Sequence, residues 1–462
     1  MIRLFRGKMQ QNSYKDIWVS RVGLGVIFCY CLTASIFGAF FAQIHLTLHF
    51  LQFPVFVGEM LLLICLILFG CVSKDSSLFN RRSVFFLFLY FGWVLLRALI
   101  NYYYDGPLTC RNAALFYYPV FAVFAYCFYQ KAQIPRKVLM ALAFLAAGII
   151  FFKWMTAWCW WTYVILFVIA VWNIKSEKLR WLGWLLLAVI LLLGKEYLYQ
   201  GPRAHFVSIF GAVVFLALYF GFLLVKQRNF VRLSILLATF FLFIMGFFIF
   251  SNRNDIYSVT SLKGMNNTYN DFDKEYRAKE AAFVPEKLTV HLYNQKKLTH
   301  EVVHSIIHSQ IRNGRELDLD ENNIVFRLFV WRDMAHELIQ ERAWWGFSFG
   351  HPQRSRSLEV LGWAQSEWGR DGWITPHNSF FHVIYRAGIL GMGLICILFY
   401  MIGKLIKDFF NMNSIEGGIL VGGLIYWLVL SNFFVILEFP YNAIIFWTLF
   451  GITWSYRKCL KA

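Results

Sequence analysis

Apolar residues in this chain come in long runs that are separated by short basic segments. The runs are about 18 to 25 residues long, the length that an α-helix needs to cross a lipid bilayer. We place twelve of them near 19–42, 48–70, 84–101, 112–130, 137–152, 154–173, 180–195, 202–225, 230–250, 378–404, 416–437 and 439–456. The pattern predicts an all-α polytopic membrane protein with about 12 transmembrane helices.

Lys and Arg are concentrated in every second connection between these runs. They precede the first run, follow the second, fourth, sixth, eighth and tenth runs, and end the chain. Because cytoplasmic loops carry the excess of Lys and Arg, both termini are predicted to be cytoplasmic. This orientation divides the chain into nine spans in residues 1–250, an outer loop domain in 251–377, and three spans with a cytoplasmic tail in 378–462.

Composition supports the membrane interpretation, and the charge distribution removes a rival one. Hydrophobic residues make up 59% of the 462 residues and charged residues 15%, with a net charge of +18. A basic chain can indicate nucleic-acid binding, but the outer segment from Ser251 to Pro376 has 16 Lys and Arg against 17 Asp and Glu. The excess therefore lies in the membrane-flanking loops, which predicts membrane lipid and no nucleic acid as its partner.

The outer segment is about 125 residues long, and loops of this length are usually functional. Its residues 325–341 have apolar positions at helical spacing, which predicts an amphipathic helix. Residues 252–294 are polar and irregular.

Two outward-facing helix starts are predicted beside this segment. Gly201 and Pro202 precede Arg203 at the start of the eighth run. At the tenth run, Thr375 is the expected N-cap and Pro376 the expected first helical residue. Free N–H groups and a positive dipole end at each start suit an anion such as a pyrophosphate.

Three further features lie close to these starts in the sequence. Arg327 is on the predicted amphipathic helix, a turn runs from Gly346 to Gly350, and His377 follows Pro376. Arginine binds phosphate oxygens in a bidentate manner, and histidine exchanges a proton near neutral pH. The glycines are expected to form a turn that returns the chain to the membrane, with a phosphate cradle as the alternative.

Together these residues resemble the signature region of the O-antigen ligase and O-antigen polymerase superfamily. The residues that carry the resemblance are 327–331, 346–350, 377–381, Gly388, Gly391 and Arg203. The twelve-span layout with a large outer loop before the last three spans also resembles this family. The long first half of the loop departs from compact family members, which leaves acceptor recognition open.

The resemblance implies an enzyme of the bacterial inner membrane that transfers a glycan from undecaprenyl pyrophosphate on the periplasmic side. It implies an inverting, metal-independent glycosyl transfer that needs no cofactor. By this resemblance Arg203 and Arg327 bind the diphosphate, and the catalytic His377 activates the acceptor hydroxyl.

Each of these residues also has an interpretation without catalysis. His377 could be a polar residue at a helix start, and Arg203 could extend its side chain to lipid headgroups. Arg327 could form a surface ion pair, with Arg332 as the true contact. Asn378 is a further candidate at the helix start.

Ionisable residues inside the predicted spans are costly and therefore also candidates. Arg386 in the tenth run and Glu59 in the second could bind substrate, or could pair with each other or with Arg97. Asp105 and Arg111, in the short outer connection after the third run, could also contact substrate.

A zinc-protease pattern is present in the outer segment but is disfavoured. His300, Glu301 and His304 match HExxH, and His308 lies one turn further on. Three histidines spaced by four residues along a helix do not converge on one zinc ion, so we expect a solvated helix and no metal.

Three hypotheses for function remain, and the first two differ in the acceptor. A ligase transfers glycan to the lipid A core, and the compact pattern around His377 favours this hypothesis. A polymerase transfers it to a growing lipid-linked glycan. A lipid-linked glycan flippase, the alternative from another class, would be expected to carry charged residues in many spans, whereas here they are sparse.

Overall fold

The structure is a computed structural model. It describes residues 14–42, 44–48, 53–72, 81–106, 108–134, 203–228, 323–353, 355–357 and 376–461, together with positions 230, 234, 274 and 277. The chain divides into two compact units, one of residues 1–237 and 393–462 and the other of residues 238–392.

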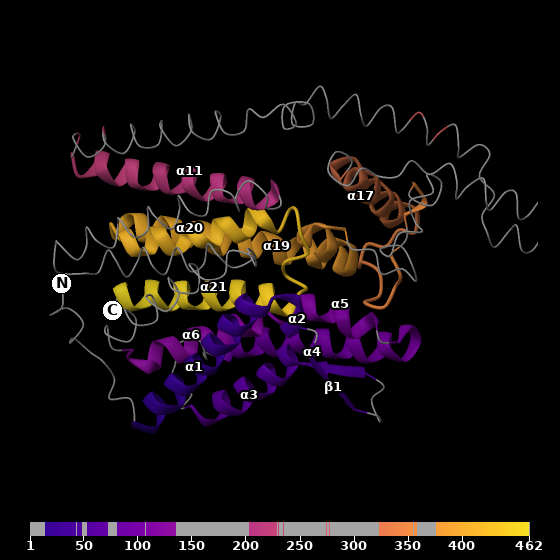
Figure 1. The fold of residues 1–462 in the computed structure, drawn as a ribbon, viewed down its shortest axis with the longest axis horizontal. Helices are drawn as coiled ribbons and strands as arrows, with labels where there is room; N and C mark the ends of the chain where they lie inside the picture. The colour runs from indigo at the N-terminus through magenta and orange to yellow at the C-terminus, as the bar shows by residue number, and fades with distance from the viewer. Residues whose placement is uncertain are drawn as a thin grey trace, which may run out of the picture. The chain divides into compact units, whose positions relative to one another are not determined.

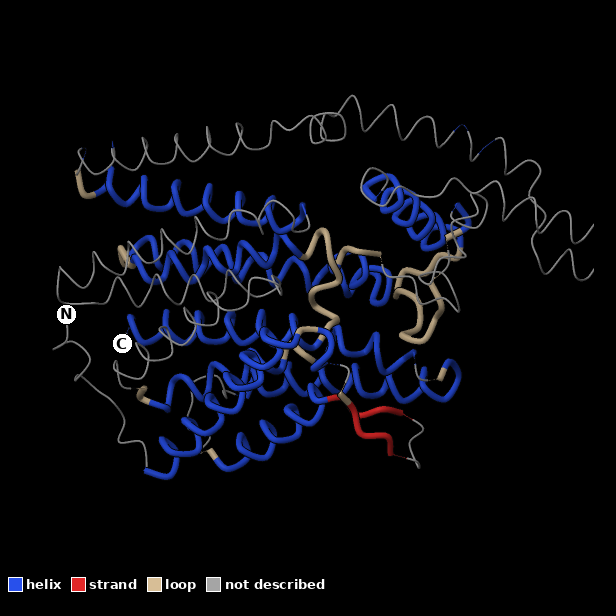
Figure 2. Tube along the Cα trace, viewed as in Figure 1, coloured by secondary structure: helices blue, strands red, loops and turns tan. Residues whose placement is uncertain are grey.

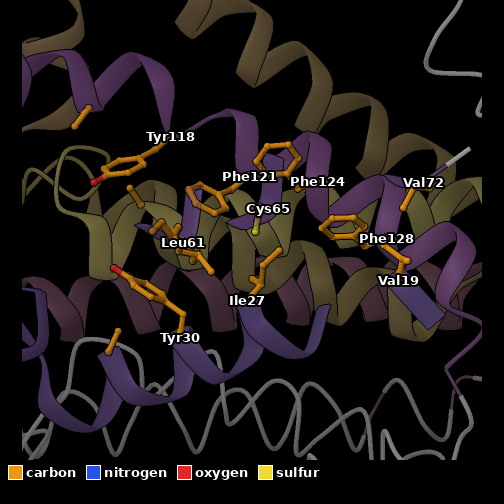
Figure 3. Close-up of a cluster of buried hydrophobic side chains, with 14 residues drawn as sticks. Val19, Ile27, Tyr30, Leu61, Cys65, Val72, Tyr118, Phe121, Phe124 and Phe128 are labelled. Carbon is orange, nitrogen blue, oxygen red and sulfur yellow. The ribbon is translucent and has the colours of Figure 1, made fainter. Parts of the chain in front are cut away.

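The core of the first unit is formed by four helices that pack around aromatic side chains. They are α1 (Tyr14–Phe37), α3 (Val57–Cys71), α6 (Val120–Ala132) and α21 (Pro440–Lys461). Figure 3 shows the cluster between them, in which Phe121, Phe124 and Phe128 from α6 face Ile27 of α1. A row of aromatic rings at one helix face buries a large apolar area and fixes the packing of its neighbours.

Close backbone contact joins α6 to α21. A Cβ atom at Gly451 would lie only 2.2 Å from the Ala122 carbonyl oxygen, so no larger residue fits at this crossing. Small residues at such crossings allow membrane helices to approach each other. Ala443, Ile444 and Phe446 of α21 are fully buried, which fits this arrangement.

Five further helices of the described residues lie in the first unit, which also contains residues 393–411 of α19 (Ser379–Asn411). They are α2 (Ala39–Ala42), α4 (Arg81–Asp105), α5 (Leu108–Tyr117), α11 (Arg203–Lys226) and α20 (Ile415–Leu430). Besides α6 and α21, a second pair of helices in extensive contact is α11 and α20, which lie side by side (Figure 1).

A short β-hairpin precedes α3 and was not predicted. Strands β1 (His45–Leu48) and β2 (Phe53–Phe56) pair antiparallel, with His45 opposite Phe56 (Figure 2). The prediction of a helix over 48–70 was therefore wrong at its start, because α3 begins only at Val57. The apolar residues before Val57 are compatible with a β-strand as well as with a membrane-spanning helix. The pairing of the two strands stabilises the strand conformation here.

Five described helices are long and apolar enough to cross a membrane. They are Tyr14–Phe37, Phe85–Asp105, Thr109–Ala132, Val207–Lys226 and Ser379–Asn411, and Val57–Cys71 and Ile415–Leu430 are shorter apolar helices. The chain is a mostly helical multi-pass membrane protein. The runs predicted at 137–152, 154–173, 180–195 and 230–250 lie wholly or largely outside the described residues, so the count of 12 stays a prediction.

Two buried polar contacts stabilise the first unit. Glu59 accepts hydrogen bonds from Tyr117 (2.5 Å) and Tyr118 (2.7 Å). Arg111 forms an ion pair with Glu438, whose side chain is 1% exposed, over 2.8 Å. The sequence suggested Arg386 or Arg97 as partners of Glu59, but Glu59 instead binds the two tyrosine hydroxyls. The guanidinium of Arg97 lies over the Trp93 ring.

The second unit contains α17 (Asn323–Gln340), the segment that follows it to Ser357, and the first part of α19 (Ser379–Asn411). The predicted amphipathic helix over 325–341 is confirmed. Within α19 the backbone of Gly388 is non-helical (φ 54°, ψ −132°), which divides the helix into residues 379–387 and 389–411. The candidate site is formed by α17 and the start of α19.

Candidate functional site

Trp331 fixes α17 against the start of α19. Its indole Nε1 donates a hydrogen bond to the Pro376 carbonyl oxygen at 2.6 Å. Its ring also stacks on Phe381, with centroids 6.3 Å apart and planes 17° from parallel. Because Arg327 lies one helical turn before Trp331, these contacts hold Arg327 near His377, which follows Pro376.

The start of α19 differs from the prediction. Its first helical residue is Ser379, and the Asn378 side-chain Oδ1 accepts a hydrogen bond from the Phe381 N–H at 2.9 Å. Asn378 is therefore the N-cap, and the prediction of Thr375 as N-cap and Pro376 as the first helical residue was wrong. Asparagine is a stronger cap than threonine, and Pro376 instead supplies the carbonyl that Trp331 binds.

His377 lies just outside the helix in a left-handed backbone conformation, with φ at 47°. Residues other than glycine seldom adopt this conformation, although histidine does so more often than most. The conformation costs about 1–2 kcal/mol, and the cap at Asn378 and the Trp331 contact with Pro376 hold it from both sides. Backbone strain of this kind clusters at functional sites.

Burial and charge keep the imidazole of His377 neutral. Partial burial lowers its pKa to about 4, and the positive charge of Arg327 acts in the same direction. Burial also lowers the pKa of Arg327, to about 10, so the guanidinium remains charged at neutral pH. The site therefore combines a fixed cation with a neutral base.

Arg332, the alternative to Arg327, belongs to a separate polar network. It donates a hydrogen bond to the Ser357 hydroxyl at 2.8 Å and lies 3.6 Å from an Asp333 carboxylate oxygen. Asp333 in turn accepts hydrogen bonds from the Ser355 hydroxyl and from both the hydroxyl and the N–H of Ser357, at 2.6 to 2.7 Å. These bonds tie residues 355–357 to α17.

Arg386 is buried at 1% exposure and holds the glycine-rich turn. Its Nη1 donates hydrogen bonds to the carbonyl oxygens of Ser348 and His351, both at 2.7 Å, and its Nε to His382 at 3.2 Å. The sequence offered Arg386 as a substrate contact. Its contacts with the turn give it a structural role, and the turn prediction for Gly346 and Gly350 is confirmed.

Glu337 joins the same turn to α19. It accepts a hydrogen bond from Tyr385 (2.6 Å) and pairs with His351 (3.0 Å). Burial alone would raise the pKa of Glu337, but the hydrogen bonds from His351 and Tyr385 outweigh it, and the pKa is lowered. Sequence reasoning did not identify Glu337 or Asp333, although their spacing of four residues on one helix face was a usable signal.

Gly346 and Gly388 allow the turn and α19 to meet backbone to backbone. Gly388 has φ at 54°, and a Cβ atom there would lie 2.0 Å from the Trp344 carbonyl oxygen. Gly346, with φ at 73°, approaches the backbone of Ala387 and Gly388 almost as closely. Neither position has room for a side chain.

We therefore expect Gly388→Ala to destabilise the second unit by at least ~2 kcal/mol, from the positive φ and the backbone clash together. Gly393→Ala is the matched control, since Gly393 is on the same helix and a Cβ atom there would have no neighbouring atom within 4 Å. Thermal unfolding in detergent compares the two. Equal midpoints for both variants would contradict the packing described.

The remaining predicted residues lie in the first unit or outside the described part. The described part of α11 starts at Arg203, while Gly201, Pro202 and the Arg203 side chain lie outside the described residues, so the predicted helix start there stays a prediction. Arg111 is paired with Glu438. The HExxH segment at His300 also lies outside, and the described residues contain no group of three or more His, Cys, Asp or Glu that could hold a metal.

Comparison with known proteins assigns a family to this part of the chain. Residues 198–396 match a protein-family model described as O-antigen ligase. The match includes α11, α17, the turn and the start of α19, and so contains both helical segments that form the site. No curated protein and no solved structure matches the chain.

Proposed function

On the match of residues 198–396 to the O-antigen ligase family model, we propose that the protein transfers a glycan from undecaprenyl pyrophosphate to an acceptor hydroxyl. The reaction takes place on the periplasmic side of the bacterial inner membrane. It is an inverting glycosyl transfer that uses neither a metal nor a cofactor.

The observation that carries this proposal is the neutral, partly buried His377 beside the charged Arg327. A sugar carbon bonded to a diphosphate already has a good leaving group, so two tasks remain. The diphosphate charge must be held, a role that we assign to Arg327 and, on the family resemblance alone, to Arg203. The acceptor hydroxyl must lose its proton, which His377 takes.

The bonds change in one displacement. The acceptor oxygen attacks C1 of the sugar on the face opposite the diphosphate, and the bond from C1 to the diphosphate oxygen breaks. The electron pair leaves with the diphosphate, and the acceptor proton passes to the His377 imidazole. Attack from the opposite face inverts the configuration at C1.

Donor binding strengthens the base. In the free site the charge of Arg327 lowers the pKa of His377. Burial is the larger cause of the low pKa, and it remains when the donor binds. A bound diphosphate offsets only the part due to the Arg327 charge, so donor binding raises the pKa of His377 by that part. The histidine is thus neutral when the acceptor arrives and becomes more basic where its proton acceptance is needed.

This behaviour predicts the acid limb of the pH profile. Because kcat/KM for the donor reports the free enzyme, it should stay nearly constant from pH 7 down to about pH 5, well below the ordinary histidine range. Initial rates at low donor concentration across this range measure it. A fall centred near the ordinary histidine pKa of 6.5 would contradict a buried, neutral His377.

We propose the lipid A core as the acceptor, because the histidine pattern at the start of α19 is compact and ligase-like. The test is a transfer assay with purified protein, undecaprenyl-pyrophosphate-linked glycan and lipid A core. A shifted lipid A core band supports a ligase. A ladder of lengthened lipid-linked glycan without that band means a polymerase, and no product of either kind favours a lipid-linked glycan flippase.

A further inference from the structure

Large apolar side chains are exposed at the end of α17. Trp344 is 61% exposed, Trp345 72% and Ile339 69%. Outside α19, these are the exposed large hydrophobic residues in the described part of the second unit. Such a group of apolar side chains on one short segment usually marks an interaction surface.

The segment lies beside the kink of α19. The Ile389 N–H donates a hydrogen bond to the Trp344 carbonyl oxygen at 2.9 Å, and the Phe347 N–H to the Tyr385 carbonyl oxygen at 2.8 Å. Together with the backbone contact at Gly388, these bonds fix the two tryptophans at one level of α19. That level is the point where the helix changes its surroundings.

Burial along α19 changes abruptly at this point. From Ser379 to Gly388 no residue is exposed, whereas Ile389, Leu390 and Met392 are 58%, 38% and 52% exposed. Exposed apolar residues on a membrane-spanning helix face lipid. Residues 389–411 of α19 are about 35 Å long at 1.5 Å per residue, close to the ~30 Å thickness of the hydrocarbon layer. The hydrocarbon layer therefore begins near Ile389.

We propose that Ile339, Trp344 and Trp345 form an interfacial anchor, which binds the phospholipid bilayer at the boundary between headgroups and acyl chains. Tryptophan favours this depth because its ring is apolar and its N–H is polar. The anchor lies beside Ile389, the first exposed residue of α19, to which Trp344 is hydrogen-bonded.

The anchor gives α17 a second attachment besides the Trp331 contacts. The N-terminal half of α17 is held by Trp331 against Pro376, and its C-terminal end is held by the bilayer. The surface is separate from Arg327 and His377, so lipid contact here does not depend on the reaction proposed for those residues.

The test is site-specific photocrosslinking of the full-length chain in nanodiscs of phosphatidylethanolamine and phosphatidylglycerol. The photoreactive residue p-benzoylphenylalanine is placed in three separate variants, Trp345→p-benzoylphenylalanine, Met392→p-benzoylphenylalanine and Arg356→p-benzoylphenylalanine. Met392 is the lipid-facing reference on α19. Arg356 is the reference for an exposed position between the two serines that bind Asp333. All three positions are exposed, so thermal midpoints near that of the unchanged chain confirm folding.

After irradiation, mass spectrometry measures the fraction of protein that carries a phospholipid. We expect the adduct at position 345 to match that at position 392 and to exceed that at position 356 several-fold. An adduct at position 345 no greater than that at position 356 would overturn the proposal.

Discussion

His377→Ala is expected to lower the rate of glycan transfer by about 10²–10⁴-fold, the usual contribution of a general base. Without the imidazole, the acceptor proton loses the base assigned to it, and Arg327 cannot replace that base because it is a cation with no acceptor atom. The loss should appear in kcat, while donor binding through the arginines is retained. The measurement is the initial rate of product formation at saturating donor and acceptor.

The same variant should remain folded. Alanine also has a Cβ atom, so the left-handed backbone at position 377 costs about as much as before. The Asn378 cap and the Trp331 contact with Pro376 do not involve the imidazole. His336→Ala, at an exposed position on α17, is the matched control and should retain full activity. Full activity in His377→Ala would refute the role assigned to this residue.

Arg327→Gln is expected to lower kcat/KM for the lipid-linked donor by about 10²–10³-fold, the effect of removing one group that stabilises developing negative charge. The guanidinium is partly buried and remains charged, so its attraction for a diphosphate is screened less than at an open surface. Arg327→Lys should recover only part of the loss, because an ammonium group keeps the charge but not the bidentate geometry. Rates over a range of donor concentrations measure both variants.

Arg332→Gln is the comparison that distinguishes the two arginines of α17. Arg332 contacts Ser357 and Asp333, so its loss should lower the thermal midpoint more than it lowers transfer. Arg327→Gln should lower transfer more than it lowers the thermal midpoint. If Arg332→Gln lowered kcat/KM for the donor and Arg327→Gln left it unchanged, the diphosphate contact would be assigned to Arg332 instead.

Local patterns in the sequence predicted much of the helical structure. The apolar run at 84–101 corresponds to α4 at Arg81–Asp105, and helical spacing over 325–341 corresponds to α17. Both signals lie within one segment and need no distant partner. The β-hairpin before α3 was missed because four-residue strands leave too short a pattern to separate from a membrane span.

Contacts between distant segments explain what the sequence could not supply at the site. The sequence analysis expected Thr375 as the cap of α19, whereas the structure has Asn378 there, together with a hydrogen bond from Trp331, 45 residues before Pro376. The bonds of Glu337 with His351 and Tyr385 likewise join three separate segments. Residue types and the family resemblance identified His377 and Arg327 as candidates, with Arg332 as the alternative, and the folded chain places Arg327 near His377.

The cap at Asn378 also restricts how this stretch of chain can change in length. The helix register is set at Asn378, and Trp331 holds both Pro376 before it and Phe381 after it. One residue inserted or deleted between these two contacts would turn the following helix face by about 100° relative to His377. Related chains that keep this site should therefore show no insertions or deletions from Pro376 to Phe381, whatever the length of the loop that precedes it.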